Sequence, residues 1–338
     1  MSEKPLISVT NIKTYFPIYG GVFSRQVGDV KAVDGLSFDI YEGEIFGLVG
    51  ESGCGKSTVG RTILRLLDPT AGKVKFRDDI LFSVEENERL SEEKMRLLRR
   101  DMQIIFQDPF ASLDPRMNVS NIVSEGLIAH KLAKRSEAVE IAIDLLERCG
   151  IAGENAGKYP HEFSGGQRQR ISIARALSFN PKFIVCDEPI AALDVSIQAQ
   201  ILTLMQELKE EFNLTYLFIS HDLGVVRYFC DRIGVMYLGN FVETGTSEQL
   251  FDNPLHPYTK ALLSSMPLLD SGLEMERIIL KGSVPSPANP PSGCKFHTRC
   301  PFVFEKCKME KPEMIEVEPE HWVACFLVEN SSENQNEG

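Results

Sequence analysis

Eight residues near position 50 constrain the fold of this 338-residue chain more than any other feature. The segment Gly50-Glu51-Ser52-Gly53-Cys54-Gly55-Lys56-Ser57 follows an apolar run at residues 45–49 and precedes apolar side chains at helical spacing in residues 58–67. Glycines let backbone N–H groups converge on an anion without a Cβ in the way, and the positive end of the next helix faces the same anion. The order strand, loop, helix therefore predicts a P-loop that binds nucleotide phosphates.

Two side chains in this loop add chemistry that glycine lacks. We expect Lys56 to reach the β- and γ-phosphates of a nucleotide and the hydroxyl of Ser57 to ligate Mg²⁺. The candidate cofactor-binding residues of this segment are Gly50, Glu51, Ser52, Gly53, Cys54, Gly55, Lys56, Ser57 and Thr58.

Polar residues also follow two later apolar segments. Asp187 and Glu188 come directly after residues 183–186, and His221 comes shortly after residues 217–219. An amphipathic helix is expected between them, at 197–212, so strands alternate with helices and predict an α/β fold with a mainly parallel, doubly wound core. Ligands of such cores bind at the carboxyl ends of the strands.

These strand-end residues suit nucleotide hydrolysis. We expect Asp187 to orient Mg²⁺, and Glu188 to accept a proton from an attacking water or to orient that water. His221 is placed to contact the γ-phosphate. For Asp187 and Glu188 the alternative reading is a solvated acid pair at a strand end, and the P-loop in the same chain argues against it. A lone histidine at a strand end is more often structural, so the role of His221 depends on its position and on the family resemblance given below.

Charge and hydropathy exclude several classes of protein. The formal net charge of −12 argues against a nucleic-acid-binding face, because phosphate contacts need an excess of lysine and arginine. No uncharged apolar run is long enough to span a bilayer, and residues 1–5 lack a signal-peptide core. We therefore expect a soluble intracellular protein, or a peripheral subunit docked on a membrane protein.

The remaining segments predict the organisation of the chain. A short strand is expected at 6–9, a loop-like stretch at 20–30, and mostly helix from about 109 to 177. Residues 284–291 are proline-rich and read as a linker, and the polar end at 331–338 is expected to be disordered.

Four of the eight cysteines cluster near the C-terminus. Cys294, Cys300, Cys307 and Cys325 have five, six and seventeen intervening residues. Four thiolates suit an iron–sulfur cluster or zinc, although the spacing differs from the Cys-x-x-Cys pairs of many zinc sites, and His297 and His321 are alternative ligands. Unligated reduced thiols are the remaining interpretation. The other cysteines, Cys54, Cys149, Cys186 and Cys230, read as small buried residues.

Over residues 6–260 the chain resembles the ATP-binding cassette (ABC) family of ATPases. The motifs that carry the resemblance occur in the family's order, with Phe163 in place of the usual leucine and Ala191 in place of the usual serine. The resemblance implies a Q-loop, a signature that binds the ATP of a partner ATPase, a D-loop, a switch histidine and an aromatic residue stacked on adenine. The residues matched to these roles are Gln107, then Ser164, Gly165, Gly166 and Gln167, then Asp194, His221, and Phe16 or Tyr15.

The resemblance extends to the helical region and to metal binding. Gln107 joins Ser57 and Asp187 as an implied Mg²⁺ residue, and joins Lys56, Glu188 and His221 in the catalytic set. A groove beside the Q-loop is implied to receive a short helix of a membrane permease. Phe110, Leu113 and Met117 either line this groove or belong to the core.

Within this family the chain resembles the peptide-importer branch, over nearly its whole length. Asn253-Pro254-Leu255-His256-Pro257-Tyr258-Thr259, the run at 290–294 and the run at 298–301 carry this resemblance, as does the early insertion before Ala32. It implies a nucleotide-binding domain at 1–260 with a helical subdomain at about 108–178, and an extension at 261–338. It also favours a [4Fe–4S] cluster over zinc at the four cysteines.

The implied function is the ATP-hydrolysing subunit of a dipeptide or oligopeptide importer. Its implied partners are two permease subunits, a second ATPase that is a paralogue or a second copy, and an external binding protein, with the chain on the cytoplasmic side of the membrane. Nickel, glutathione or an oligosaccharide are alternative cargoes. A non-transport ABC ATPase, or a regulatory iron–sulfur protein with a vestigial cassette, fits less well because the chain has one cassette with both Glu188 and His221.

Overall fold

A computed structural model describes residues 4–21, 23–266 and 278–329. The chain forms two compact units. The first consists of Met1–Ile40, Ile45–Arg89 and Ser220–Gly338, and the second of Tyr41–Glu44 and Leu90–Ile219. The predicted disorder at 331–338 lies outside the described residues.

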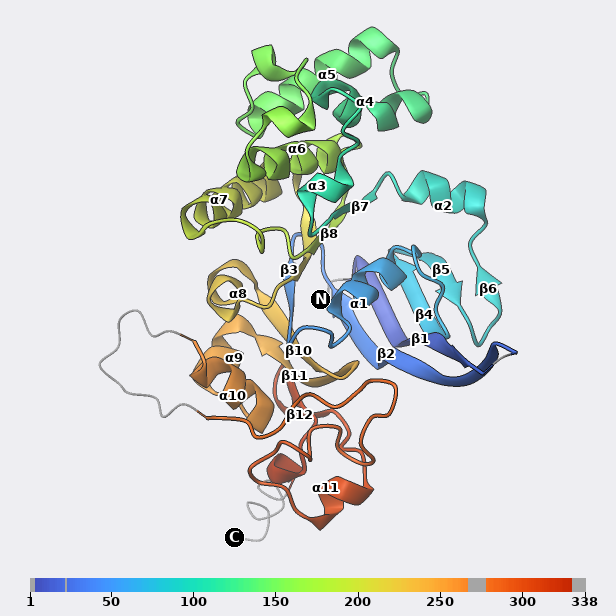
Figure 1. The fold of residues 1–338 in the computed structure, drawn as a ribbon, viewed down its shortest axis with the longest axis vertical. Coiled ribbons are helices and arrows are strands. Elements are labelled where there is room, and N and C mark those ends of the chain that lie inside the picture. Colours follow the sequence, from blue (N-terminus) through green and yellow to red (C-terminus); the bar gives the residue numbers. More distant parts are fainter. Residues whose placement is uncertain (1–3, 22, 267–277, 330–338) are drawn as a thin grey trace. The chain divides into compact units, whose positions relative to one another are not determined.

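The first unit contains a five-stranded antiparallel sheet with the strand order β2-β1-β4-β5-β6 (Figure 1). Burial alternates along β4, so one face of this sheet covers the core. The strands are β1 (Ile7–Gly20), β2 (Arg25–Ile40), β4 (Ala71–Phe76), β5 (Asp79–Ser83) and β6 (Glu88–Arg89).

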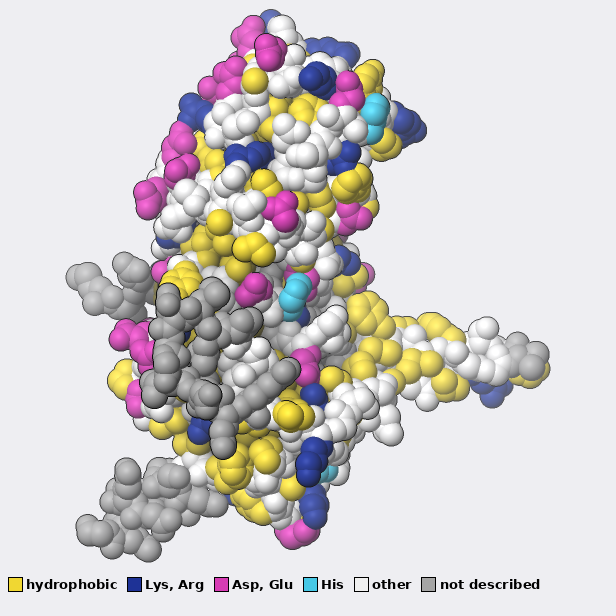
Figure 2. Space-filling model, turned by 60° about the vertical axis from the view of Figure 1, so that its left-hand side comes forward, with side chains coloured by type: hydrophobic (Ala, Val, Ile, Leu, Met, Phe, Trp, Pro, Cys, Tyr) yellow, Lys and Arg dark blue, Asp and Glu magenta, His cyan; other side chains and the backbone are white. Residues whose placement is uncertain are grey.

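In the N-terminal segment the structure confirms one expected strand but lengthens it, and corrects one expected loop. The strand expected at 6–9 extends to Gly20, and most of the loop-like stretch at 20–30 belongs to β2. The outer parts of β1 and β2 pair with each other, with Gly20 opposite Arg25, and Tyr19 and Phe23 are exposed. Figure 2 shows hydrophobic side chains along this hairpin. Because neither face of the ribbon is buried, its sequence has no strand-like alternation.

A second set of strands in the first unit carries the P-loop. β3 (Ile45–Val49) is buried throughout and pairs in parallel with β10 (Arg232–Tyr237). The order then continues through β11 (Asn240–Thr246), β13 (His321–Val323) and β12 (Ile315–Glu318), all antiparallel. The helices of this unit are α1 (Lys56–Ile63), α8 (Leu223–Phe229), α9 (Ser247–Asp252), α10 (Pro257–Ser264) and α11 (Glu305–Met309).

The second unit has a three-stranded parallel arrangement in the order β9-β8-β7. β8 (Phe183–Asp187) and β9 (Thr215–Ile219) are buried at every residue, as is typical of strands covered on both faces. β7 is Met102–Ile105. Its helices are α2 (Glu92–Leu98), α3 (Pro109–Ser112), α4 (Val119–Ala129), α5 (Arg135–Arg148), α6 (Gly165–Leu177) and α7 (Val195–Phe212), with short 3₁₀ turns at Gly153–Asn155 and Pro160–Glu162.

The expected parallel strand pairs are therefore present, and the chain also has antiparallel pairs. The antiparallel sheet and the strands β11–β13 were not predicted. Of these, β13 pairs with a segment that is distant in the sequence, and β12 is largely exposed. In the parts of the chain that the structure describes, no helix is long and apolar enough to cross a membrane.

Candidate nucleotide-binding site

The P-loop in the first unit has a backbone that only glycine adopts easily. Gly50 has φ 150° and Gly55 has φ 109°. A Cβ on Gly55 would lie 2.0 Å from the carbonyl oxygen of Ala32, and one on Gly50 would lie 2.3 Å from the carbonyl oxygen of Met236. Gly55 is also the N-cap of α1, so the loop leads directly into the helix N-terminus. The local structure therefore meets the requirements of an anion-binding loop.

Lys56 lies folded into this loop. Its side chain is buried, and its Nζ donates hydrogen bonds to the carbonyl oxygens of Gly50 at 2.8 Å and Glu51 at 3.4 Å. Cys54 is buried beside it, and burial raises the pKa of the Cys54 thiol. The loop thus holds a cation ready for phosphate, whereas Cys54 stays an unreactive thiol.

In the second unit, the structure brings together two of the expected catalytic residues. Asp187 ends β8 and is buried, and Glu188 follows it with φ 47°, in the left-handed region. The Glu188 N–H donates to the carbonyl oxygen of Ile219 at 3.0 Å. Gln107 Nε2 donates to Glu188 Oε2 at 3.0 Å, across 81 positions of the chain. The strained backbone at Glu188 therefore aims its carboxylate at the Q-loop.

The signature motif forms the start of α6. The Ser164 hydroxyl accepts from the Gln167 N–H at 3.3 Å, and Gln167 Oε1 accepts from the Ser164 N–H at 2.9 Å, which is a capping box. A Cβ on Gly166 would lie 2.5 Å from Ile197 Cγ2. The glycine therefore allows α6 to approach α7 closely.

The expected D-loop lies beside this motif. A Cβ built on Gly165 lies 3.5 Å from Leu193 Cδ2, and Asp194 caps α7 by accepting from the Ile197 N–H at 3.0 Å. Ser164 and Asp194 are exposed. The second unit therefore presents the signature and the D-loop as neighbouring surface segments.

The remaining nucleotide-contact candidates lie in the first unit. His221 is exposed in the segment just before α8. The Tyr15 hydroxyl donates to the Asp34 carboxylate, and the Lys31 ammonium lies 5.7 Å from the centre of the Tyr15 ring. Phe16 is 39% exposed. Of the two aromatic candidates, Phe16 is the one whose ring is open to a ligand.

The candidates for a permease groove divide between surface and core. Phe110 is exposed, and the guanidinium carbon of Arg168 lies 3.6 Å from the centre of its ring. Leu113 is buried and Met117 is half-buried. Because Arg168 belongs to α6, the segment after the Q-loop contacts the signature helix through a cation–π pair.

The four C-terminal cysteines line one small cavity in the first unit. His297 and Phe296 line it as well. Burial raises the pKa of Cys294 to about 11 and that of Cys325 to about 12. Among the described residues, however, no three His, Cys, Asp or Glu side chains are gathered at the spacing of a metal site. The donor chemistry suits a soft metal, and the coordination geometry is not formed.

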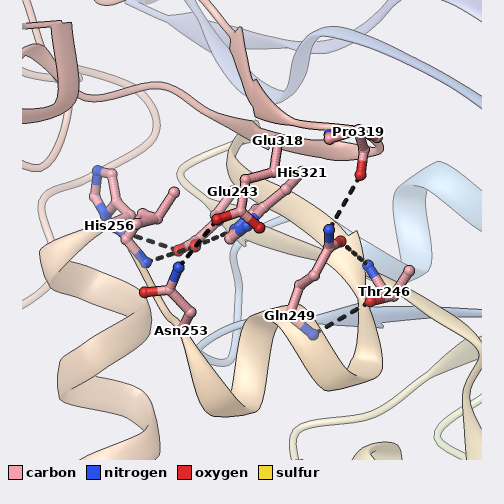
Figure 3. Close-up of polar contacts among 9 residues, drawn as sticks. Glu243, Thr246, Gln249, Asn253, His256, Glu318, Pro319 and His321 are labelled. Carbon is pink, nitrogen blue, oxygen red and sulfur yellow. Dashed lines mark hydrogen bonds and ion pairs between the residues drawn. The ribbon is translucent and has the colours of Figure 1, made fainter. Parts of the chain in front are cut away.

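His321, the other histidine considered as a ligand, is absent from the lining of this cavity. It is fully buried on β13, and its Nε2 lies 2.9 Å from Glu243 Oε1 (Figure 3). The Glu243 carboxylate also accepts from the N–H groups of Leu255 at 2.7 Å and His256 at 2.9 Å. The sequence indicated no role for Glu243. The one sequence feature that pointed to this part of the fold was the motif containing His256, whose N–H group donates to Glu243.

Comparison with known proteins identifies both parts of the chain. Residues 33–191 match the family model described as ABC transporter, and residues 242–307 match the one described as the C-terminal region of oligopeptide/dipeptide transporters. The second match includes Cys294, Cys300 and Cys307 but ends before Cys325.

Similar proteins span almost the whole chain. The oligopeptide transport ATP-binding protein AppF of Bacillus subtilis is 55% identical, over 96% of this chain and 98% of its own length. The dipeptide transport ATP-binding protein DppF of Haemophilus influenzae is 45% identical, over 96% of this chain and 97% of its own length.

Two solved structures share the cassette. The ATP-binding cassette MJ0796, a dimer bound to ADP and Pi, is 28% identical with a TM-score of 0.62, over 71% of this chain and 98% of its own. CbiO1 of Clostridium perfringens is 27% identical with a TM-score of 0.61, over 74% and 92%. The chain therefore belongs to the ABC transporter family and is a transport ATPase of its oligopeptide and dipeptide branch.

Proposed function

We propose that this chain hydrolyses ATP to energise the import of dipeptides or oligopeptides. The observation that carries the chemistry is the hydrogen bond from Gln107 to Glu188, which orients a carboxylate at the end of a buried strand. The peptide cargo rests on the nearly full-length similarity to peptide transport ATP-binding proteins.

The site residues have separate roles in this proposal. The P-loop backbone and Lys56 bind the phosphates, Glu188 accepts a proton from the attacking water, and His221 contacts the γ-phosphate. The oxygen donors of Ser57, Gln107 and Asp187 suit Mg²⁺, which would neutralise phosphate charge. Phe16 stacks on adenine.

The signature implies that a second ATPase completes each site. Ser164, Gly165, Gly166 and Gln167 would meet the ATP held by a partner, which is a paralogue or a second copy of this chain. Phe110 is exposed where a permease helix would dock. Two permease subunits and an external binding protein would complete the importer, with this chain on the cytoplasmic face of the membrane. The boundary at residue 260 and the helical subdomain at about 108–178 stay predictions.

We also propose that the four cysteines near the C-terminus bind an iron–sulfur cluster, with zinc as the alternative. Two observations support this proposal: the four cysteines line the same cavity, and thiols are suitable ligands for such a cluster. Protein purified without oxygen should contain iron and sulfide, and Cys300→Ser should lose both. Cys230→Ser, at a buried cysteine outside the cavity, is the control. Zinc without iron, or iron retained by Cys300→Ser, would contradict this assignment.

Peptide uptake tests the main proposal. Cells lacking this chain should lose uptake of labelled dipeptides or oligopeptides, and wild type but not Glu188→Gln should restore it. Arg116→Gln, which breaks an exposed ion pair with Asp114, is the control and should restore uptake fully. Undiminished uptake in cells that have no second peptide importer would rule out the peptide cargo.

A further inference from the structure

Residues of the C-terminal segment make hydrogen bonds and an ion pair to the P-loop. The carboxylate of Glu51, the second residue of the loop, accepts two hydrogen bonds from the guanidinium of Arg299, at 2.6 and 3.0 Å. The Arg299 side chain is 8% exposed and that of Glu51 is 28% exposed. A bidentate ion pair whose side chains are this little exposed fixes both partners in position, in contrast to an ordinary surface ion pair.

A second contact holds the backbone of the same residue. The Glu51 N–H donates to the hydroxyl of Tyr258 at 2.9 Å. Tyr258 is fully buried, and its ring packs against those of Tyr237 at 4.8 Å and Phe296 at 5.4 Å between centroids. Glu51 is therefore anchored through its side chain and its main chain by groups that cannot easily move.

The same C-terminal segment also supports the loop at Cys54, through the residues that contact its backbone. The Lys295 ammonium donates to the Leu238 carbonyl oxygen and to Asp34 Oδ2, both at 2.8 Å. The next residue, Gly239, donates its N–H to the carbonyl oxygen of Cys54 at 2.9 Å. Contacts at Glu51 and at Cys54 thus lead back to residues 295–299.

These contact residues lie between two of the clustered cysteines. Cys294 precedes Lys295 and Cys300 follows Arg299. The segment is a compact turn, in which the N–H groups of Arg299 and Cys300 both donate to the carbonyl oxygen of Phe296, at 3.0 and 3.1 Å. The position of Arg299 is therefore tied to that of the cysteine cavity.

Arg299 also has an electrostatic effect on the P-loop, in addition to its packing. Glu51 places a negative charge in a loop whose proposed ligand is a polyanion, and an unpaired carboxylate there would repel phosphate. The guanidinium neutralises this charge while leaving the convergent N–H groups of the loop unaltered. Lysine would supply the charge but not the planar fork.

We propose that Arg299 and Tyr258 are positioning residues for nucleotide binding: they hold Glu51 in place and offset its charge, so that the P-loop keeps its phosphate-receiving conformation. This inference rests on the proposed function, in which the P-loop binds ATP. It assigns the C-terminal segment a direct effect on the affinity for nucleotide.

Equilibrium binding of MgADP and of a non-hydrolysable ATP analogue to the full chain tests this inference. Arg299→Leu should raise the Kd for nucleotide at least about tenfold, because it breaks a charge-assisted pair and leaves the Glu51 carboxylate uncompensated. Arg299→Lys should lie between Arg299→Leu and wild type. Tyr258→Phe, which removes one hydroxyl, should raise the Kd about threefold or more. Lys308→Met breaks the Lys308–Glu305 pair of α11 and should bind as wild type does.

The outcomes separate this inference from the proposed function. If wild type does not bind nucleotide, or if Lys56→Ala binds as tightly as wild type, the P-loop assignment itself fails. If wild type binds nucleotide, Lys56→Ala binds it more weakly, and a folded Arg299→Leu has the wild-type Kd, the positioning role is overturned. Should Arg299→Leu not fold, Tyr258→Phe decides in the same way, and a lowered melting temperature with unchanged Kd would show a purely structural role.

Discussion

His256 is a buried histidine whose neutral form the fold requires. Its Nδ1 accepts a hydrogen bond from the Tyr258 N–H at 3.0 Å and so caps α10. Burial lowers the pKa of His256 from the ordinary 6.5 to about 4, although the nearby Glu243 carboxylate favours the charged form. Protonation at Nδ1 would also remove the acceptor that caps the helix.

The lowered pKa of His256 predicts a loss of stability in acid. Between about pH 6.5 and pH 4 the unfolded chain binds a proton at this residue that the folded chain does not, so the free energy of unfolding falls as the pH falls. At pH 5 the loss is about 2 kcal/mol. His256→Asn keeps a capping oxygen without this titration. Urea unfolding at pH 7.5 and pH 5 should show a smaller decrease for His256→Asn than for wild type, and equal decreases would contradict the assignment.

Single residues differ in how far sequence reveals them. Gln107 and Glu188 stand in recognisable motifs, and the structure shows them in contact. Glu243 and Arg299 carry no such spacing, because their roles depend on groups from segments that meet only after folding. A buried polar partner that is distant in sequence has no local pattern to predict it.

At the scale of elements, Glu243 joins three pieces of the first unit. It lies on β11, its carboxylate receives the N–H groups that precede α10, and it contacts His321 on β13. β13 pairs with β11 in register at Glu243 with Val323 and at Thr244 with Trp322, and the Ala324 N–H donates to the Val242 carbonyl oxygen at 2.8 Å. So short a strand depends on side-chain contacts for its place.

Glu243→Gln should therefore loosen the C-terminal strands. The amide presents N–H donors to groups that are themselves donors, in a site with no exposure, and we expect a loss of about 3 kcal/mol in the free energy of unfolding. Hydrogen exchange should increase in β12, β13 and the start of α10. Glu318→Gln, at an exposed carboxylate nearby, is the matched control (Figure 3). Unchanged exchange at β13 would show that backbone pairing alone holds the strand.

Elements of the parallel core were easier to predict than those of the antiparallel sheet. β8 and β9 are continuous apolar runs that end in polar residues, whereas β2 and β12 are exposed along much of their length. Burial on both faces leaves a clear mark on the sequence, and edge or ribbon pairing does not. The four C-terminal cysteines line one cavity, and their spacing alone left the ligand open.

At the scale of the whole molecule, the signature and the D-loop are exposed segments that the proposed function assigns to contact with a partner ATPase. Ser164 and Asp194 are exposed and cap their helices, and Gly165 and Gly166 add no side chain to the start of α6. The solved cassette MJ0796, to which this chain is similar, is a dimer. In the function proposed above, a nucleotide bound to one P-loop is covered by the signature of a second ATPase.

Glu188→Gln should trap this closed dimer. The amide oxygen can still accept from Gln107, but it cannot take a proton from water, so hydrolysis should slow at least about a hundredfold and ATP should remain bound. Light scattering after gel filtration with MgATP should show a doubled mass, alone or with the paralogous ATPase. Lys56→Ala/Glu188→Gln is the control, because it should not bind ATP and should stay monomeric. Normal hydrolysis by Glu188→Gln would show that Glu188 is not the base. A monomer with bound ATP, both for the chain alone and for the chain mixed with the paralogous ATPase, would argue against nucleotide-driven closure.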